Sequence, residues 1–402
     1  MKTKIEPKTL KGFRDFLPQE AKKRQYVIDA MKKVFELYGF EPLETPALEY
    51  EDILVGKYGE EGDKLMYRFE DNGGRKVALR YDQTIPLARI IAQYQNIALP
   101  FKRYQIQSVW RAENTQKGRY REFLQCDADI VGSASVLSDA ETITTAAKSV
   151  EALGFKKYKI LINDRTIFGE FQKPVITMVD KLKKIGAEKV KQELKAKGFS
   201  PKILNELIDK KPTTLVEEII AAVEQMGIDK KLLDFEPTLA RGLDYYTGLI
   251  FEIEVDKYNA GSICGGGRYD NLIGLFAGKQ IPALGFAFGF DRIIEAMNDQ
   301  NLFPTTLLNS ITKVLVTVFS SQYLSGSLKV VSTLRNAGIN AEIYLDEKTG
   351  LEKQLKYADK KNISYVVIIG PKEKEKNTAI LRNMQTKQQE EVAQKELIKK
   401  FR

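Results

Sequence analysis

The spacing of apolar residues predicts a helix near the N-terminus and a series of strands after it. Within 20–39 apolar residues recur at intervals of three and four, and Gly39 is suited to end the helix. The helix face comprises Val27, Met31, Val34, Phe35 and Tyr38. From 65 to 131 the pattern alternates as in strands, apart from a helix over 84–95. The segments FKRYQIQSVWRAE and REFLQCDADIVG are predicted to pair as an antiparallel hairpin across the polar loop NTQKGRY.

The pattern changes twice more along the chain. A helix over 138–153 and a strand in KKYKILIND precede residues 165–235, which are rich in Lys and Glu and predict an insertion of small amphipathic helices. Strands return in TGLIFEIEVD, GSICGGGRYDNL and PALGFAFGFDRIIEAM, the last running into a helix. After the linker NLFPTTLLNS, alternating strands and helices favour a small α/β domain with a mostly parallel sheet. We therefore expect one domain at 1–312, with the insertion at about 165–235, and a second at 313–402.

Charge is concentrated at the C-terminal end of the chain. The 402 residues carry a net charge of +9, and residues 313–402 hold 17 Lys and Arg against 10 Asp and Glu, which is +7. A basic terminal domain suits a polyanion such as nucleic acid. The alternative is a lysine-rich surface that is merely solvated.

The sequence predicts a cytoplasmic protein without a membrane segment. No apolar run reaches the roughly 18 residues that span a bilayer, and the N-terminus lacks the apolar core of a secretory signal. Cys126 and Cys264 are the only cysteines, too few for a disulfide framework and not spaced as a metal motif.

The residue types available restrict the chemistry. The chain contains no histidine, which excludes histidine-based nucleophile systems, general bases and metal ligands. It has neither a P-loop nor a GxGxxG fingerprint, so bound phosphates would be held by side-chain cations. Arginine suits that role because its planar fork binds phosphate oxygens in pairs. The candidates at strand or loop boundaries are Arg111, Arg121, Arg241 and Arg292.

Several segments together resemble one enzyme family. WRAENTQKGRYREF, GFAFGFDRI and FEPLETPALE, which contains Pro46, resemble motifs 2, 3 and 1 of class II aminoacyl-tRNA synthetases. ARGLDYYTG and SICGGGRYDNL resemble the two signature motifs of histidyl-tRNA synthetases, and LRYDQT and REFLQCDADIVG also match that family. The resemblance runs from KGFRDFLP to the C-terminal domain. It implies an α+β fold: a catalytic antiparallel sheet flanked by helices, a helical insertion and an α/β anticodon-binding domain.

The resemblance implies that histidine is activated by ATP and then loaded onto its tRNA. Arg111 and Arg241 would hold the α-phosphate, and Arg292 the γ-phosphate. Phe123 would stack on adenine, with Glu113 and Arg121 placing the nucleotide. Mg²⁺ would accompany ATP, with no dedicated set of metal ligands in the protein.

The same resemblance implies a histidine pocket and contacts with RNA and a second subunit. The residues that would surround histidine are Asp82, Thr84 and Gln125 at the ammonium group, Asp129, Tyr246 and Tyr269 at the imidazole, and Arg241 and Tyr245 beside them. The glycines at 265–267 would pack under this pocket. The loop residues Gln116, Lys117 and Arg119 would contact tRNA, and motif 1 would form a homodimer.

Two alternatives remain on the sequence alone. One is the non-aminoacylating regulatory paralogue of ATP phosphoribosyltransferase, which usually lacks the C-terminal domain and has altered signature motifs. The other is a non-catalytic RNA-binding protein, which loss of Arg111, Arg241 or Arg292 would have favoured. All three arginines are present.

Overall fold

The chain forms two compact units. The computed structural model describes residues 5–57, 59–115, 119–169, 171–241 and 245–401. The units are Met1–Leu302 and Phe303–Arg402, so the division lies before the boundary expected at 312/313. The stretch between the two positions contains a 3₁₀ turn, η3 (Thr305–Leu308), and groups with the second unit. None of the described helices is long and apolar enough to cross a bilayer.

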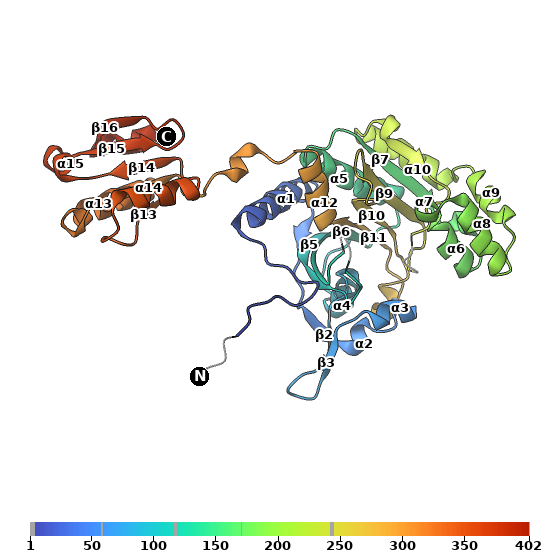
Figure 1. The fold of residues 1–402 in the computed structure, drawn as a ribbon. Coiled ribbons are helices and arrows are strands. Elements are labelled where there is room, and N and C mark those ends of the chain that lie inside the picture. The colour runs from blue at the N-terminus through green and yellow to red at the C-terminus, as the bar shows by residue number, and fades with distance from the viewer. Residues whose placement is uncertain (1–4, 58, 116–118, 170, 242–244, 402) are drawn as a thin grey trace. The chain divides into compact units, whose positions relative to one another are not determined.

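An eight-stranded sheet forms the centre of the first unit (Figure 1), in the order β1-β5-β6-β11-β10-β9-β7-β8. Its strands are β1 (Glu41–Pro42), β5 (Phe101–Trp110), β6 (Glu122–Val131), β7 (Tyr158–Asp164), β8 (Leu233–Phe235), β9 (Leu249–Val255), β10 (Cys264–Arg268) and β11 (Ala283–Gly289). All neighbours from β5 to β7 are antiparallel, and β1 and β8 pair in parallel at the two edges. The expected antiparallel sheet is confirmed.

Three helices, α1 (Pro18–Leu37), α5 (Val136–Ala152) and α12 (Phe290–Asp299), cover one face of this sheet. Pro18 at the first turn and the left-handed Gly39 beyond the last turn bound α1, because proline has no N–H to satisfy and glycine accepts a positive φ. The residues that α1 buries, Val27, Met31 and Phe35, are spaced four apart. The Phe35 ring lies 6.0 Å from the ring of Phe286 in β11, so the helix packs directly on the sheet.

The alternation of side chains along the strands separates this core from a polar face. The even-numbered Cys126 of β6 places its Sγ 3.5 Å from Met31 Sδ of α1. The odd-numbered residues of β6 therefore point to the other face, and they pair in register with small residues of β11. These pairs are Gln125 with Gly289, Asp127 with Ala287, and Asp129 with Gly285.

A smaller three-stranded sheet in the order β2-β4-β3 adjoins four helices. Its elements are β2 (Leu48–Tyr50), β3 (Arg68–Glu70), β4 (Lys76–Leu79), α2 (Glu51–Leu54), α3 (Gly59–Lys64), α4 (Thr84–Gln93) and α11 (Gly274–Ala277). Buried Leu54, Ile85 and Leu87 belong to one apolar cluster that also includes Tyr269.

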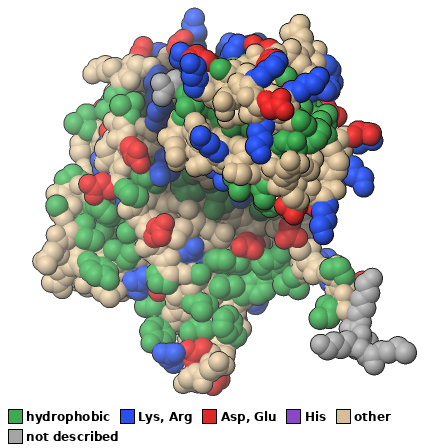
Figure 2. All heavy atoms as spheres, turned by 90° about the vertical axis from the view of Figure 1, so that its left-hand side faces the viewer, with side chains coloured by type: hydrophobic (Ala, Val, Ile, Leu, Met, Phe, Trp, Pro, Cys, Tyr) green, Lys and Arg blue, Asp and Glu red, His purple; other side chains and the backbone are tan. Residues whose placement is uncertain are grey.

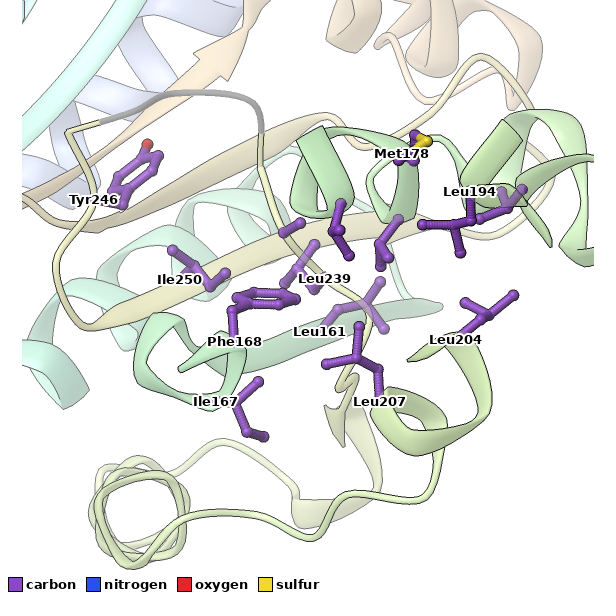
Figure 3. Close-up of a cluster of buried hydrophobic side chains, with 14 residues drawn as sticks. Leu161, Ile167, Phe168, Met178, Leu194, Leu204, Leu207, Leu239, Tyr246 and Ile250 are labelled. Atoms are coloured by element: carbon purple, nitrogen blue, oxygen red, sulfur yellow. The ribbon is translucent and has the colours of Figure 1, made fainter. Parts of the chain in front are cut away.

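Residues 165–235 form a set of short helices, as expected from their composition. These are η1 (Arg165–Phe168), α6 (Lys173–Val179), α7 (Leu182–Ile185), α8 (Ala187–Ala196), α9 (Lys202–Ile208), α10 (Thr214–Gln225) and η2 (Lys230–Leu232). Met178, Leu194 and Leu207 pack in one buried cluster with residues of β7 and β9 (Figure 3). The same cluster includes Tyr246, so the apolar core of the insertion extends to a residue expected to bind substrate.

The second unit has a five-stranded sheet in the order β13-β12-β14-β15-β16, flanked by helices. Its elements are β12 (Val314–Val316), η4 (Ser321–Tyr323), α13 (Leu324–Asn336), β13 (Ala341–Ile343), α14 (Leu351–Lys360), β14 (Tyr365–Ile368), α15 (Pro371–Lys376), β15 (Thr378–Asn383), β16 (Gln389–Ala393) and η5 (Gln394–Lys400). The first three strands in chain order are parallel and the last two antiparallel, so the sheet is mixed. The last element of this unit is the 3₁₀ segment η5. Figure 2 shows Lys and Arg side chains gathered mainly in the upper part of the face it displays, whereas the lower part shows more hydrophobic side chains.

Candidate active site

A cavity of about 440 Å³ lies on the polar face of the large sheet. This volume is within the range of small-molecule sites. Nearly all the residues expected to bind histidine or ATP line it. They are Asp82, Thr84, Arg111, Glu113, Phe123, Gln125, Asp129, Arg241, Tyr245, Tyr246, Tyr269 and Arg292.

The loop candidates divide into three groups. Arg119, expected at the tRNA, lines the cavity and lies 3.6 Å from the Glu113 carboxylate. Arg121 is not among the lining residues; its Nε donates to the Glu113 carbonyl at 3.2 Å and its Nη1 to that of Lys11 at 3.4 Å. Gln116 and Lys117 lie outside the described residues.

Asp129 is held by two neighbours, one in β5 and one just after β10. Arg103 of β5, opposite Asp129 in the register, places Nη2 2.7 Å from Oδ2, and the Tyr269 hydroxyl donates to Oδ1. Burial raises the pKa of Asp129, while the positive charge of Arg103 opposes the rise. The carboxylate is therefore fixed at the cavity wall, with a phenol beside it. Asp129 and Tyr269, both expected at the imidazole, are brought together.

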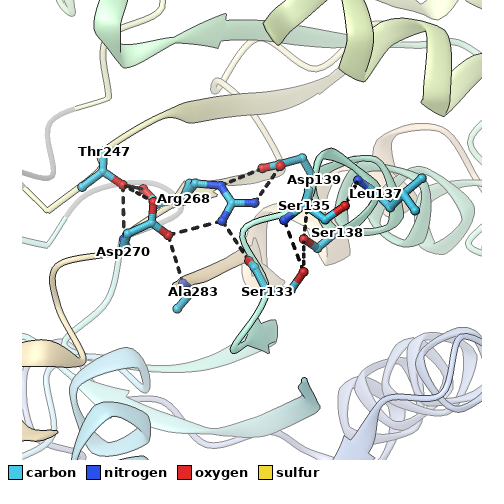
Figure 4. Close-up of polar contacts among 9 residues, drawn as sticks. All are labelled: Ser133, Ser135, Leu137, Ser138, Asp139, Thr247, Arg268, Asp270 and Ala283. Atoms are coloured by element: carbon cyan, nitrogen blue, oxygen red, sulfur yellow. Dashed lines mark hydrogen bonds and ion pairs between the residues drawn. The ribbon is translucent and has the colours of Figure 1, made fainter. Parts of the chain in front are cut away.

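The residues before and after Tyr269 in the chain are fixed by polar contacts, which Figure 4 draws. Buried Arg268 donates to both carboxylate oxygens of Asp139, at 3.1 and 2.6 Å, and to the Ser133 carbonyl at 3.0 Å. Asp270 accepts from the Ala283 amide at 3.1 Å. Paired hydrogen bonds of this kind fix geometry as well as adding energy.

The turn before α4 supplies the second carboxylate. Asp82 Oδ1 accepts from the backbone N–H groups of Thr84 and Ile85, each at 3.1 Å, which satisfies donors at the start of the helix. Gln83 donates from Nε2 to the Gln125 carbonyl at 3.2 Å, which joins this turn to β6. Asp82, Thr84 and Gln125, expected at the ammonium group, thus occupy one wall.

Arg111 continues the same wall beyond the end of β5. Its Nε donates to the Tyr81 carbonyl at 3.1 Å, and its Nη2 donates to Gln125 Oε1 at 3.3 Å. The guanidinium carbon lies 4.5 Å from the Tyr81 ring centroid and 5.0 Å from that of Phe123. Two aromatic faces therefore keep this cation in place beside the cavity.

Arg241 lines the cavity from a different part of the chain than Arg111. Its backbone is left-handed, with φ 47°, which is unusual for a residue other than glycine. Nη1 lies 3.2 Å from Glu252 Oε1 of β9, and the side chain is 19% exposed. A strained backbone at a charged cavity residue is typical of functional sites.

Arg292 lies in the first turn of α12, and its Nη1 donates to the Ser262 carbonyl at 2.8 Å. The preceding residue, Asp291, accepts from Arg14 Nη2 at 2.8 Å and from Arg24 Nη1 at 3.0 Å. Besides Arg119, the cavity is therefore lined by Arg111, Arg241 and Arg292, each supported by a different part of the chain.

Small residues of β10 and β11 form the cavity floor. A Cβ on Gly265 would lie 1.4 Å from Arg241 Nη1, and a Cβ on Gly285 would lie 2.0 Å from Asp129 Oδ1. These contacts are far below van der Waals distance. The glycines are required because functional side chains lie directly against the floor.

Three further residues of the site were not identified from the sequence. Asp127 lines the cavity, Arg103 neutralises Asp129, and Glu252 pairs with Arg241. Period-two alternation would have found Asp127, because it lies between Gln125 and Asp129 on one face of a predicted strand.

Asp127 has the chemistry to orient Gln125. Its Oδ2 accepts from Gln125 Nε2 at 2.7 Å. In its ionised form Asp127 only accepts, so the amide oxygen of Gln125 is then left for Arg111 and for a further donor such as an ammonium group. Burial raises the pKa of Asp127 to about 8, with Arg103 opposing the rise and Asp129 adding to it.

For the histidine pocket that the sequence resemblance implies, we predict that Asp127→Asn raises the KM for histidine about tenfold, with a smaller change in kcat, because a hydrogen bond to a charged group contributes about 1.5–3 kcal/mol. In the empty cavity a carboxyl with a pKa of about 8 holds its proton at neutral pH. A bound ammonium group favours the ionised form, so binding releases a proton and tightens as pH rises. The KM for histidine should therefore fall from about pH 7 to about pH 8 in the parent and change less in the variant.

The matched control is Asp234→Asn, whose exposed carboxylate pairs with Lys159 away from the cavity. Steady-state pyrophosphate exchange at several pH values would measure both variants. An Asp127→Asn enzyme with the parental KM and pH profile would contradict the role.

Fold and site define a class of protein. An antiparallel sheet presents arginines and carboxylates to one cavity, without a glycine-rich phosphate loop, and a separate unit with a mixed sheet follows. This is the arrangement of class II aminoacyl-tRNA synthetases.

Comparisons with known proteins give the family. The family model described as histidyl-tRNA synthetase matches residues 12–197 and 202–293, and that of an anticodon binding domain matches 313–402. The chain is 38% identical to the histidine–tRNA ligase of Cytophaga hutchinsonii over 98% of this chain and 99% of that protein. It is 40% identical to that of Bacteroides fragilis over 98% of each. The crystal structure of histidyl-tRNA synthetase from Nostoc sp. PCC 7120 matches with a TM-score of 0.84 at 31% identity, covering 99% of both chains. The chain belongs to the histidyl-tRNA synthetase family.

Proposed function

We propose that the cavity joins L-histidine to ATP as histidyl-adenylate, and that the histidyl group is then transferred to the 3′ end of histidine tRNA. One observation carries this function. A single cavity contains buried carboxylates, which suit ammonium and imidazole groups, and it also contains Arg111, Arg241 and Arg292, which suit phosphate. The regulatory-paralogue alternative is less supported, because the chain matches the histidine–tRNA ligases over nearly its whole length, including the C-terminal domain.

In the activation step the α-carboxylate of histidine attacks the α-phosphorus of ATP in line. The bond to the bridging oxygen breaks, and pyrophosphate leaves with the bonding electron pair. Arg111 and Arg241 would neutralise the α-phosphoryl group, and Arg292 would hold the γ-phosphate. Phe123 would stack on adenine, while Glu113 and Arg121 would support the nucleotide from the hairpin.

The histidine side of the cavity would supply specificity. Asp82, Thr84 and Gln125 would bind the ammonium group, and Asp129, Tyr246 and Tyr269 the imidazole, with Tyr245 packed beside them. The Tyr245 ring centroid lies 5.9 Å from that of Tyr269, so the aromatic residues form one wall. A pocket built to hydrogen-bond its substrate strongly rejects analogues that lack the partner group.

ATP would bring its own magnesium. Among the described residues no three His, Cys, Asp or Glu side chains lie close enough together to hold a metal ion, so Mg²⁺ would be bound mainly by phosphate oxygens. We further propose that the C-terminal unit binds the anticodon region, that Arg119 contacts tRNA, and that the enzyme is a cytoplasmic homodimer. The free, buried Cys126 and Cys264 are in keeping with a reducing compartment.

Exchange of labelled pyrophosphate into ATP, tested with each of the twenty amino acids, examines this function directly. We expect exchange with histidine alone and its loss when Mg²⁺ is chelated. A folded protein that supports no exchange with any amino acid would instead favour the regulatory paralogue.

A further inference from the structure

The segment Lys11–Phe16, just before α1, lies against the hairpin that follows Arg111. The Arg121 amide donates to the Gly12 carbonyl at 3.0 Å. A Cβ on Gly12, which has a φ of +89°, would lie 2.7 Å from Arg121 Cδ and 2.9 Å from Thr115 Cγ2. The segment therefore packs tightly against two residues of the hairpin loop, Thr115 and Arg121.

Arg14 connects the same segment to the helix that carries Arg292. Its Nη2 donates to Asp291 Oδ2 at 2.8 Å, and its guanidinium carbon lies 3.2 Å from the centroid of the Tyr120 ring. Tyr120, Asp291 and Arg292 all line the cavity. One side chain thus contacts the hairpin and α12 at once, across the part of the cavity proposed for ATP.

Three arginines and one carboxylate lie close together where the N-terminal segment meets α12, so the position of each charge matters. Asp291 is 8% exposed and is shared by Arg14 and Arg24, and Arg292 is its neighbour in the chain. Burial lowers the pKa of Arg24, which Asp291 counteracts. Arg14 and Arg24 each occupy one oxygen of Asp291, whereas Arg292 donates to the Ser262 carbonyl, so Asp291 is paired with residues other than Arg292.

We propose that Arg14 is a positioning residue for ATP: through Asp291 and Tyr120 it fixes the spacing between the hairpin and the start of α12. This inference rests on the proposed function, because it assigns ATP to this part of the cavity. The residues assigned to histidine are held by other ion pairs. Arg103 pairs with Asp129, and Arg268, which precedes Tyr269, pairs with Asp139.

The test is the dissociation constant of ATP, measured by titration calorimetry without histidine, for the parent, Arg14→Ala, Arg14→Lys and Asp291→Asn. We expect Arg14→Ala to weaken ATP binding about tenfold or more, since Asp291 would keep only Arg24 and the hairpin would lose its link to α12. Arg14→Lys should recover only part of this, because lysine keeps the charge but lacks the planar fork. Histidine binding should stay within about twofold of the parent.

Two additions make the outcome decisive. The first addition is the double variant that combines Arg14→Ala with Asp291→Asn. If Arg14 acts through Asp291, this variant should bind ATP no more weakly than Asp291→Asn alone, since the effects of coupled residues are not additive. Lys8→Ala, an exposed charge just upstream that pairs with Glu6, is the matched control and should bind ATP as the parent does.

Parental ATP affinity in Arg14→Ala, or an equal loss of ATP and histidine binding, would overturn the proposal. Failure of the proposed function is distinguished by a separate result, because the parent protein itself would then lack histidine-dependent pyrophosphate exchange. If Arg14→Ala does not fold, Arg14→Lys and Asp291→Asn still carry the comparison.

Discussion

Replacing Arg241 with alanine is expected to lower histidine-dependent pyrophosphate exchange by about 10³-fold while the protein remains folded. The guanidinium borders the cavity, and its loss would remove a fixed positive charge from the phosphoryl group in the transition state. It would also leave Glu252, now 3.2 Å from Arg241 Nη1, as an unpaired negative charge near the same phosphate. Arg241→Lys should be intermediate, because it keeps the charge without the fork.

The matched control is Arg68→Ala, which removes an exposed arginine whose ion pair is with Glu51, outside the cavity. Its exchange rate should equal that of the parent, because exposed ion pairs contribute little to stability. Circular dichroism and thermal melting would establish that both variants fold. Normal exchange by Arg241→Ala would show that the proposed role of this residue is wrong, even though the family assignment would stand.

Gly265→Ala is expected to have the second largest effect, a fall in kcat of about 100-fold. The added methyl group would occupy a position 1.4 Å from Arg241 Nη1, so the guanidinium must move away from its present place. The chemistry of every side chain is retained, and only the position of one cation changes. The measurement is again pyrophosphate exchange, with kcat and both KM values determined.

Gly285→Ala is the informative comparison, because it adds the same methyl group to the neighbouring strand. There the methyl group would lie 2.0 Å from Asp129 Oδ1, so the KM for histidine should rise more than kcat falls. If both variants altered the same parameter to the same degree, the effects would reflect general damage to the sheet rather than displacement of two separate walls.

Much of the secondary structure could be predicted from local pattern. The hairpin of β5 and β6 follows from alternation around a polar loop, and α1 follows from its apolar spacing and Gly39. Elements of two to four residues, such as β1 and α2, could not be predicted because they are too short to show a period. The pairing of β6 with β11 could not be predicted from the sequence either, because it depends on packing between segments that are distant along the chain.

The site was predicted chiefly through family resemblance, and residues to which the resemblance assigned no role were missed. Arg103 is fully buried in the middle of a strand, where a charged residue normally indicates exposure. Its charged partner is Asp129 on the neighbouring strand, which is known once the hairpin register is known, and the Gln105 side chain and Gln83 carbonyl also accept from it. Arg14 could not be found at all, because its partners Tyr120 and Asp291 are distant in sequence.

The strand order of the large sheet also sets when the site can form during synthesis. Strand β6 ends at Val131, but its neighbour β11 begins at Ala283, so the whole helical insertion is translated between them. At about 5–20 residues per second, a nascent chain waits on the order of ten seconds with one edge of β6 unpaired. A chain arrested before Ala283 lacks part of the cavity floor, whereas one arrested after Leu302 contains every residue of the cavity. The ability to form the adenylate is therefore acquired late in translation, yet before any of the anticodon-binding unit has been made.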